Sequence, residues 1–111
     1  MIRLNYRRGS KAGQAMTYIL TERDITAQIV DYLRLKGAYV IKAHGHLGQR
    51  PGVPDLLVCW QGRFIAIEVK SPRYPRRGLS EKQWEEVGAI FAAGGVTIVA
   101  RRLEDVIEGL L

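Results

Sequence analysis

The chain has 111 residues, 47% of them hydrophobic, which is enough for a single domain with its own core. Seventeen Lys and Arg residues against eleven Asp and Glu residues give a net charge of +6, which favours a polyanionic partner. A single cysteine, Cys59, excludes an internal disulfide and a cysteine zinc cluster, and no apolar run approaches the roughly 20 residues of a membrane helix. The N-terminus also lacks the apolar core of a secretory signal, so we expect an intracellular protein with no membrane partner.

The first twenty residues predict a basic arm ahead of a domain that spans residues 21–111. This arm holds no acidic residue and four basic ones, namely Arg3, Arg7, Arg8 and Lys11. The stretch Arg7–Gly13 is typical of a flexible segment. Met16 is an alternative start of the chain, so part of the arm need not be native.

A first helix is predicted over residues 22–36. Thr21 is a suitable N-cap, and Glu22 and Asp24 suit the positive end of the helix dipole. The residues at helical spacing are Ile25, Ile29, Tyr32, Leu33 and Lys36. Gly37 then ends the helix.

Three strands are predicted after this helix. They cover residues 38–43, 55–60 and 63–71. A loop rich in glycine and proline precedes the second strand, and its histidines, His44 and His46, need no specific role. Gln61-Gly62 joins the second and third strands into a hairpin. We expect Cys59, in an apolar run of this hairpin, to be a small buried hydrophobic residue.

The C-terminal part adds a helix, a strand and a closing helix. Ser80 and Gln83 form a capping-box pattern at the start of the helix, and we expect Trp84 on its apolar stripe to pack in the core. Residues 96–101 predict a short buried strand, and residues 103–110 predict the last helix. The order α-β-β-β-α-β-α predicts an α/β fold with a mixed central sheet flanked by helices.

Asp55, Glu68 and Lys70 form the pattern that predicts chemistry. Side chains alternate between the faces of a strand, so Glu68 and Lys70 point the same way, and Asp55 could meet Glu68 across the hairpin. Two carboxylates suit Mg²⁺, the cation that phosphodiester hydrolysis commonly requires, and the backbone carbonyl of Val69 is a further candidate ligand. We expect Lys70 to remain protonated and to stabilise negative charge on the phosphate.

The same residues also have a purely structural explanation. Glu68 and Lys70 could be neighbours in an ordinary ion pair on a solvated sheet face. Glu-x-Lys alone is a weak pattern. Its combination with Gly52-Val53-Pro54-Asp55 at the start of the preceding strand favours a nuclease site.

These residues resemble the PD-(D/E)xK nuclease superfamily and, within it, the virus-type replication-repair nuclease (VRR-NUC) family. The resemblance covers about residues 21–110 and rests on four ordered motifs, namely Thr21-Glu22, Gly52-Val53-Pro54-Asp55, Glu68-Val69-Lys70-Ser71 and Ser80-Glu81-Lys82-Gln83. It implies a restriction-endonuclease-like α-β-β-β-α-β core and dependence on Mg²⁺ or Mn²⁺.

The resemblance also implies a substrate. Short stand-alone members of the family occur largely in phages and bacteria and are thought to act as homodimers on branched DNA, whereas longer relatives act on flaps. Because a four-way junction offers two symmetric cleavage points, a two-fold dimer suits it. We therefore expect an endonuclease that resolves Holliday junctions as a homodimer in the cytoplasm of a bacterium or a phage-infected host.

Further residues complete the expected site. Glu22 would reach the metal or its surroundings by the resemblance, or else favour only the helix dipole. Gln83 would line the site, cap its helix, or do both. Tyr74 would stack on an unpaired base. The expected contacts to the DNA backbone are Arg50, Arg73, Arg76 and Arg77.

Other functions remain open at this point. The chain could be a nucleic-acid-binding module whose basic residues bind DNA and whose acids are structural. A flap nuclease is also compatible with the resemblance. A restriction-like nuclease generally needs an additional element that recognises bases, and none is recognisable here.

Overall fold

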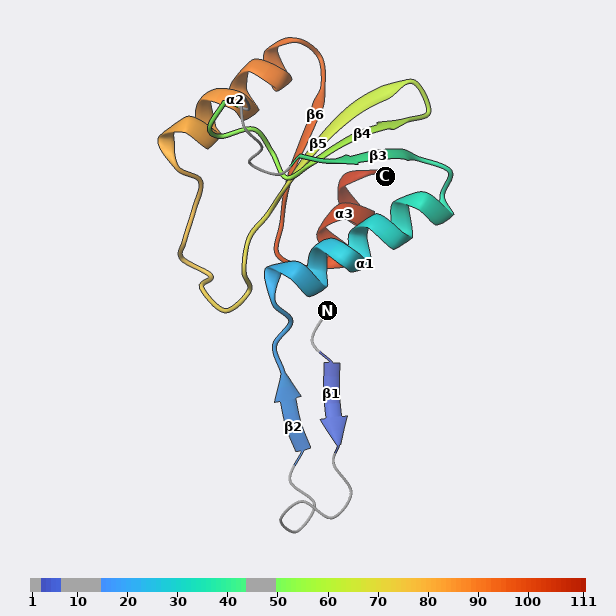
Figure 1. Cartoon of the computed structure of the whole chain (residues 1–111), viewed down its shortest axis with the longest axis vertical. Helices are drawn as coiled ribbons and strands as arrows, with labels where there is room; N and C mark the ends of the chain where they lie inside the picture. The colour runs from blue at the N-terminus through green and yellow to red at the C-terminus, as the bar shows by residue number, and fades with distance from the viewer. Residues whose placement is uncertain (1–2, 7–14, 44–49) are drawn as a thin grey trace.

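A computed structural model describes residues 3–6, 15–43 and 50–111 (Figure 1). The elements in chain order are β1 (Arg3–Tyr6), β2 (Ala15–Tyr18), α1 (Glu22–Leu35), β3 (Tyr39–Lys42), β4 (Leu56–Trp60), β5 (Arg63–Val69), α2 (Glu81–Ala92), β6 (Val96–Ala100) and α3 (Leu103–Gly109). From residue 21 onward the order is the predicted one. No helix in these ranges is long and apolar enough to cross a membrane.

Four strands form a mixed sheet in the order β3-β4-β5-β6. The pairs β3–β4 and β4–β5 are antiparallel, while β5 and β6 are parallel and are connected through α2. A parallel pair requires such a crossover, because a tight turn can join only antiparallel strands. The predicted α/β fold with a mixed central sheet is confirmed.

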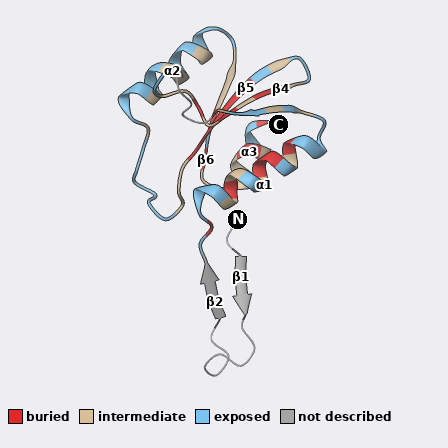
Figure 2. Ribbon diagram, viewed as in Figure 1, coloured by how far each residue is buried: buried red, intermediate tan, exposed pale blue. Residues whose placement is uncertain are grey.

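The core lies between one face of this sheet and the helices α1 and α3 (Figure 2). α1 begins at a capping box in which Thr21 and Asp24 bond each other's backbone N–H groups. Ile25, Ile29 and Leu33 then follow at helical spacing and are fully buried. The sheet side chains that meet them are Leu56, Val58, Ile65, Ile67, Val69, Ile98 and Ala100.

Helix α2 lies on the opposite face and is much less buried. Its predicted capping box between Ser80 and Gln83 is present. None of its twelve residues, all of them described, is buried, and the side chains of Trp84 and Phe91 are 62% and 72% exposed. The prediction that Trp84 packs in the core is therefore wrong. An apolar stripe indicates which side of a helix is hydrophobic, but not whether a facing surface exists to cover that side.

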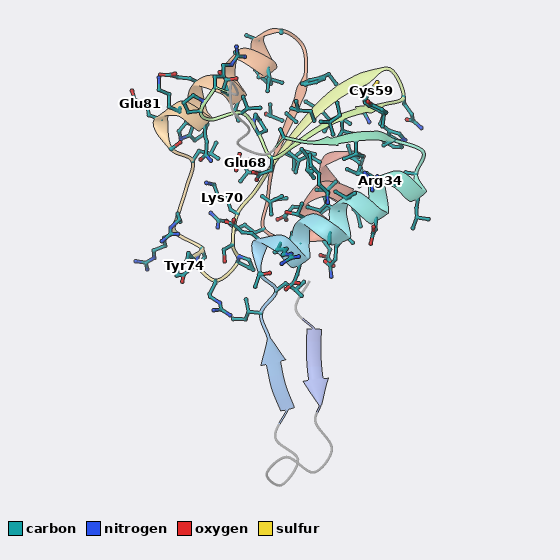
Figure 3. The ribbon with its side chains drawn as sticks, in the orientation of Figure 1. Arg34, Cys59, Glu68, Lys70, Tyr74 and Glu81 are labelled. Atoms are coloured by element: carbon teal, nitrogen blue, oxygen red, sulfur yellow. The ribbon has the colours of Figure 1, made fainter. Side chains whose placement is uncertain are left out.

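Cys59 is exposed, which contradicts the prediction that it is buried. Because strand side chains alternate, Val58 points into the core and Cys59 points to the outer face, opposite Phe64. At this end of the hairpin the outer face is open, and Phe64 itself is 47% exposed. Figure 3 places Cys59 near the turn of the hairpin, far from Glu68.

The N-terminal segment contains an antiparallel hairpin that the sequence did not predict. β1 pairs with β2 from Arg3 opposite Tyr18 to Tyr6 opposite Ala15. Two strands of four residues carry too little alternation to be recognised by pattern. The predicted flexible stretch Arg7–Gly13 lies outside the described residues, as do His44 and His46.

Candidate active site

Asp55 is fixed at the beginning of β4. Leu56 pairs with Ile67, so Asp55, one residue earlier, lies opposite Glu68. Its carboxylate oxygen Oδ2 accepts a hydrogen bond of 2.8 Å from the backbone N–H of Val69. Its backbone carbonyl accepts a second bond of 2.8 Å from the N–H of Ala43. The expected meeting of Asp55 with the end of β5 is therefore present.

Gly52 allows the preceding loop to approach α2. It has a positive φ of 87°, which non-glycine residues rarely adopt. A Cβ atom at this position would overlap the backbone carbonyl group of Lys82 in the first turn of α2. Pro54, which precedes Asp55 directly in the sequence, is fully buried. The Gly-Val-Pro-Asp motif thus holds Asp55 close to the start of α2.

Glu68 is a charged side chain in a buried position, only 5% exposed. Burial is the largest cause that raises its pKa, followed by the hydrogen bond with Asp55 and the negative charge of Asp55. Lys70 opposes this shift, Glu22 adds slightly to it, and the resulting pKa is about 8. The two carboxyl groups therefore need a shared proton or a cation.

Gln83 links the remaining groups of the site. Its Nε2 donates to Oε2 of Glu68 at 3.3 Å, and its Oε1 accepts from Nζ of Lys70 at 2.9 Å. The same Oε1 accepts from the backbone N–H of Ser80 at 2.9 Å, which is the capping-box bond. Gln83 therefore caps α2 and contacts two site residues at once. Figure 3 shows Glu68 and Lys70 side by side at the centre of the molecule.

Glu22 lines a cleft of about 590 Å³ together with Asp55 and Val69. Its Oε1 accepts a hydrogen bond of 3.0 Å from the backbone N–H of Ser71, just after β5. Two basic residues that the sequence did not single out, Arg23 and Lys42, line the same cleft. The pairing of Lys42 with Leu56 puts Lys42 next to Asp55, which only the strand register reveals.

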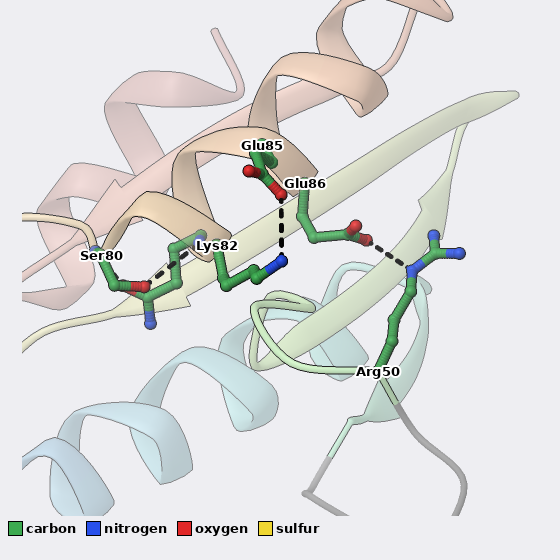
Figure 4. Close-up of polar contacts among 6 residues, drawn as sticks. Arg50, Ser80, Lys82, Glu85 and Glu86 are labelled. Atoms are coloured by element: carbon green, nitrogen blue, oxygen red, sulfur yellow. Dashed lines mark hydrogen bonds and ion pairs between the residues drawn. The ribbon is translucent and has the colours of Figure 1, made fainter.

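The predicted DNA contacts fall into two places. Arg73, Arg76 and Arg77 are exposed on the segment after β5, which we call the basic loop (residues 71–78). Arg50 instead donates to Oε1 of Glu86 on α2 at 3.0 Å (Figure 4). It borders a separate hollow beside α2 rather than the cleft of Asp55.

The donor set suits a hard divalent cation. No group of three or more His, Cys, Asp and Glu side chains placed to bind a metal occurs in residues 3–6, 15–43 and 50–111. Mg²⁺, however, is commonly held by one or two carboxylates, several waters and the phosphates of the substrate. The carboxyl pair of Asp55 and Glu68 provides that number, and a bound cation would offset the negative charge of Asp55 that contributes to the raised pKa of Glu68.

Two solved structures share this fold. One, described as "VRR_NUC domain", is 22% identical in sequence, and the match covers 82% of this chain and 96% of the other with a TM-score of 0.67. The second, described as "VRR_NUC domain protein", is 19% identical over 84% of this chain and 87% of its own, also with a TM-score of 0.67. No family model matches the sequence, and no curated protein matches it significantly.

The chain therefore has the fold of the VRR-NUC domain. This confirms the α-β-β-β-α-β core that the four sequence motifs implied.

Proposed function

We propose that this chain is a metal-dependent endodeoxyribonuclease of the VRR-NUC family, acting inside a bacterial or phage-infected cell. The observation that carries the proposal is the contact of Gln83 with both Glu68 and Lys70, beside the Asp55 carboxylate. These residues come from distant parts of the chain and meet in a domain with the VRR-NUC fold. A buried carboxylate costs stability, so the presence of Glu68 at this buried position favours a functional role.

Each residue of the site has a distinct task in phosphodiester hydrolysis. Asp55 and Glu68 would hold Mg²⁺ or Mn²⁺, with the backbone carbonyl of Val69 as a further candidate ligand. When bound, the cation would supply charge neutralisation and an acidified water. Lys70, held at its Nζ by Gln83, places a positive charge where negative charge grows on the phosphate. Glu22 lines the cleft and holds the start of the basic loop through the backbone N–H of Ser71.

We further propose that the substrate is branched DNA, in particular a four-way junction, and that the protein acts as a homodimer. The exposed arginines Arg73, Arg76 and Arg77 provide positive charge for a DNA backbone. Trp84 and Phe91 lie two turns apart on one side of α2 and are largely exposed, as expected for a surface covered by a second copy. A two-fold dimer would present two cleavage sites to a symmetric junction.

A cleavage assay tests this function. Four-way junction, flap and linear duplex DNA, each end-labelled, would be incubated with the protein in Mg²⁺, Mn²⁺ or EDTA. The variants are Glu68→Gln and Lys70→Met, with Lys82→Met as the matched control, because Lys82 is exposed and pairs only at 3.7 Å with Glu85 (Figure 4). We expect paired nicks in the junction, and a loss of at least about 100-fold in both site variants but not in the control.

The outcomes separate the candidate functions. Cleavage of the flap in preference to the junction would replace the resolvase by a flap nuclease. Binding of DNA with no cleavage in either metal would identify a non-catalytic binding module. Full activity of Lys70→Met would remove the electrostatic role of Lys70.

A further inference from the structure

The basic loop contains a repeated pattern in sequence and backbone. Residues 71–77 are Ser-Pro-Arg-Tyr-Pro-Arg-Arg, so a Pro-Arg pair occurs twice with a spacing of three. The backbone N–H of Tyr74 donates to the carbonyl of Ser71 at 3.3 Å, and that of Arg77 donates to the carbonyl of Tyr74 at 3.0 Å. The loop is therefore two consecutive turns of the same length.

The two turns place equivalent residues at equivalent positions. Pro72 and Pro75 occupy the second position of each turn, where the fixed φ of proline is favoured. Arg73 and Arg76 occupy the third position and are exposed. The loop thus presents two exposed arginines at equivalent positions of two consecutive turns.

The side chain of Arg101, which follows β6, binds the carbonyls of both turns. Its Nη1 donates to the carbonyl of Ser71 at 3.0 Å and to that of Tyr74 at 3.1 Å. Its Nη2 donates to the carbonyl of Arg77. These three carbonyls are spaced three residues apart, so one planar guanidinium joins the beginning, the middle and the end of the two turns.

Two other contacts anchor this arrangement. The backbone N–H of Arg101 donates to Oδ2 of Asp105 at 2.8 Å, which ties the residue to α3. The backbone N–H of Ser71 donates to Glu22 of the cleft. The guanidinium of Arg77 lies 4.5 Å from the centre of the Tyr74 ring, so this pair packs within the loop. The loop has a defined position relative to the carboxylates.

We propose that Arg101 is a positioning residue that holds the basic loop in a conformation already ordered to bind the phosphates of the DNA strand. Arg101 itself is occupied by carbonyls, while Arg73 and Arg76 contact phosphate. The proposal deepens the nuclease function and rests on it for the identity of the ligand. Without the Arg101 guanidinium, its three hydrogen bonds to loop carbonyls would be lost, and the repulsion among Arg73, Arg76 and Arg77 would favour an open loop. Phosphate binding would then require the loop to be ordered first.

Substitution of Arg101 by lysine tests whether this residue orders the basic loop. Arg101→Lys keeps the charge but loses the planar fork that bridges three carbonyls. Arg102→Lys is the matched control, since Arg102 pairs instead with Asp105 at 3.4 Å. Trypsin cleavage after Arg73 and Arg76, followed by mass spectrometry without DNA, should be about tenfold faster in Arg101→Lys and unchanged in the control.

DNA binding provides a second readout. The affinity for a labelled four-way junction in EDTA, measured by anisotropy, should fall about tenfold in Arg101→Lys. In the cleavage assay KM should rise by a similar factor, while kcat changes by less than about threefold. Arg73→Ala/Arg76→Ala should weaken binding strongly in the wild-type background and little in Arg101→Lys, because residues that act together are not additive.

Unchanged trypsin cleavage in Arg101→Lys would overturn the proposal, as would faster cleavage with unaltered DNA affinity. If Arg101→Lys does not fold, Pro72→Gly/Pro75→Gly replaces it. This variant loosens both turns with Arg101 intact. Unchanged trypsin cleavage and unchanged DNA affinity would again contradict the proposal that an ordered basic loop binds phosphate. Neither proteolysis nor binding requires catalysis, so both assess the loop even if the protein proves not to be a nuclease.

Discussion

At the scale of single residues, Glu68 is the side chain whose ionised form is least favourable in the metal-free site. Glu68 is buried and its carboxyl lies beside Asp55, so its charged form is disfavoured. Gln83 and Lys70 offer compensation through a hydrogen bond and a positive charge. That compensation is incomplete, because the pKa of Glu68 remains at about 8.

The pKa of Glu68 predicts how stability depends on pH without metal. The folded protein binds the proton of Glu68 up to about pH 8, whereas the usual value is 4.5. Between these values the folded state holds more protons than the unfolded state, so stability falls as pH rises. Glu68→Gln should reduce this slope and stabilise the metal-free protein at pH 8 by about 1–3 kcal/mol. Thermal unfolding from pH 5 to 8 measures the difference.

Metal provides the control for this prediction. Mg²⁺ should raise the Tm of the wild type more at pH 8 than at pH 5, because the cation competes with the proton for Glu68. The variant should show little of this effect. An identical pH slope in both proteins would mean that Glu68 does not carry the raised pKa.

At the scale of elements, the site depends on the loop before β4 approaching the first turn of α2. Gly52 makes the approach possible, since any side chain there would overlap the carbonyl of Lys82. Because Gln83 follows Lys82 directly, a shift of this turn would displace the amide that holds Glu68 and Lys70. We therefore expect Gly52 to affect the geometry of the candidate site although it contributes no side chain to it.

Comparison of two glycines tests this dependence. Gly52→Ala and Gly62→Ala both force alanine into a positive φ, 87° and 74° respectively. A Cβ at Gly62, however, would meet no atom within 4 Å in the described part of the chain, apart from its two chain neighbours. We expect both to lose about 1 kcal/mol of stability from backbone strain, and Gly52→Ala to lose at least about 1 kcal/mol more. Only Gly52→Ala should impair cleavage. Urea unfolding and the cleavage assay measure the two effects, and equal losses would show that the close approach is unimportant.

At the scale of the whole molecule, the two faces of the sheet differ. The face toward α1 and α3 is closed by apolar packing, while the face toward α2 leaves aromatic side chains in contact with solvent. Figure 2 shows this difference as buried residues between the sheet and α1 and exposed or intermediate residues along α2. We therefore expect a second copy of the chain to cover part of α2.

A charge placed on α2 tests the dimer. Phe91→Glu should convert the dimer into monomers, measured by light scattering after size exclusion, because a carboxylate would be buried in the interface. Leu35→Glu is the matched control, since Leu35 at the end of α1 is 88% exposed. Neither change should lower the Tm by more than a few degrees. A monomeric wild type would disprove the dimer without affecting the active-site proposal.

The sequence by itself determined the order of elements from α1 to α3. Local signals suffice for these, because capping boxes, the Gln61-Gly62 turn and hydrophobic periods act over a few neighbouring residues. The pairing of Asp55 opposite Glu68 also followed, since strand alternation and a short turn fix the register of a hairpin.

Other features were decided only by the tertiary structure. Exposure of Cys59 and Trp84 depends on whether a surface elsewhere in the chain covers them, and a local pattern carries no such information. The three carbonyls bound by Arg101 lie 24 to 30 residues away in sequence, so that contact arises only when β6 pairs with β5. Short-range physics specified the elements, whereas the packing of distant segments specified which side chains meet.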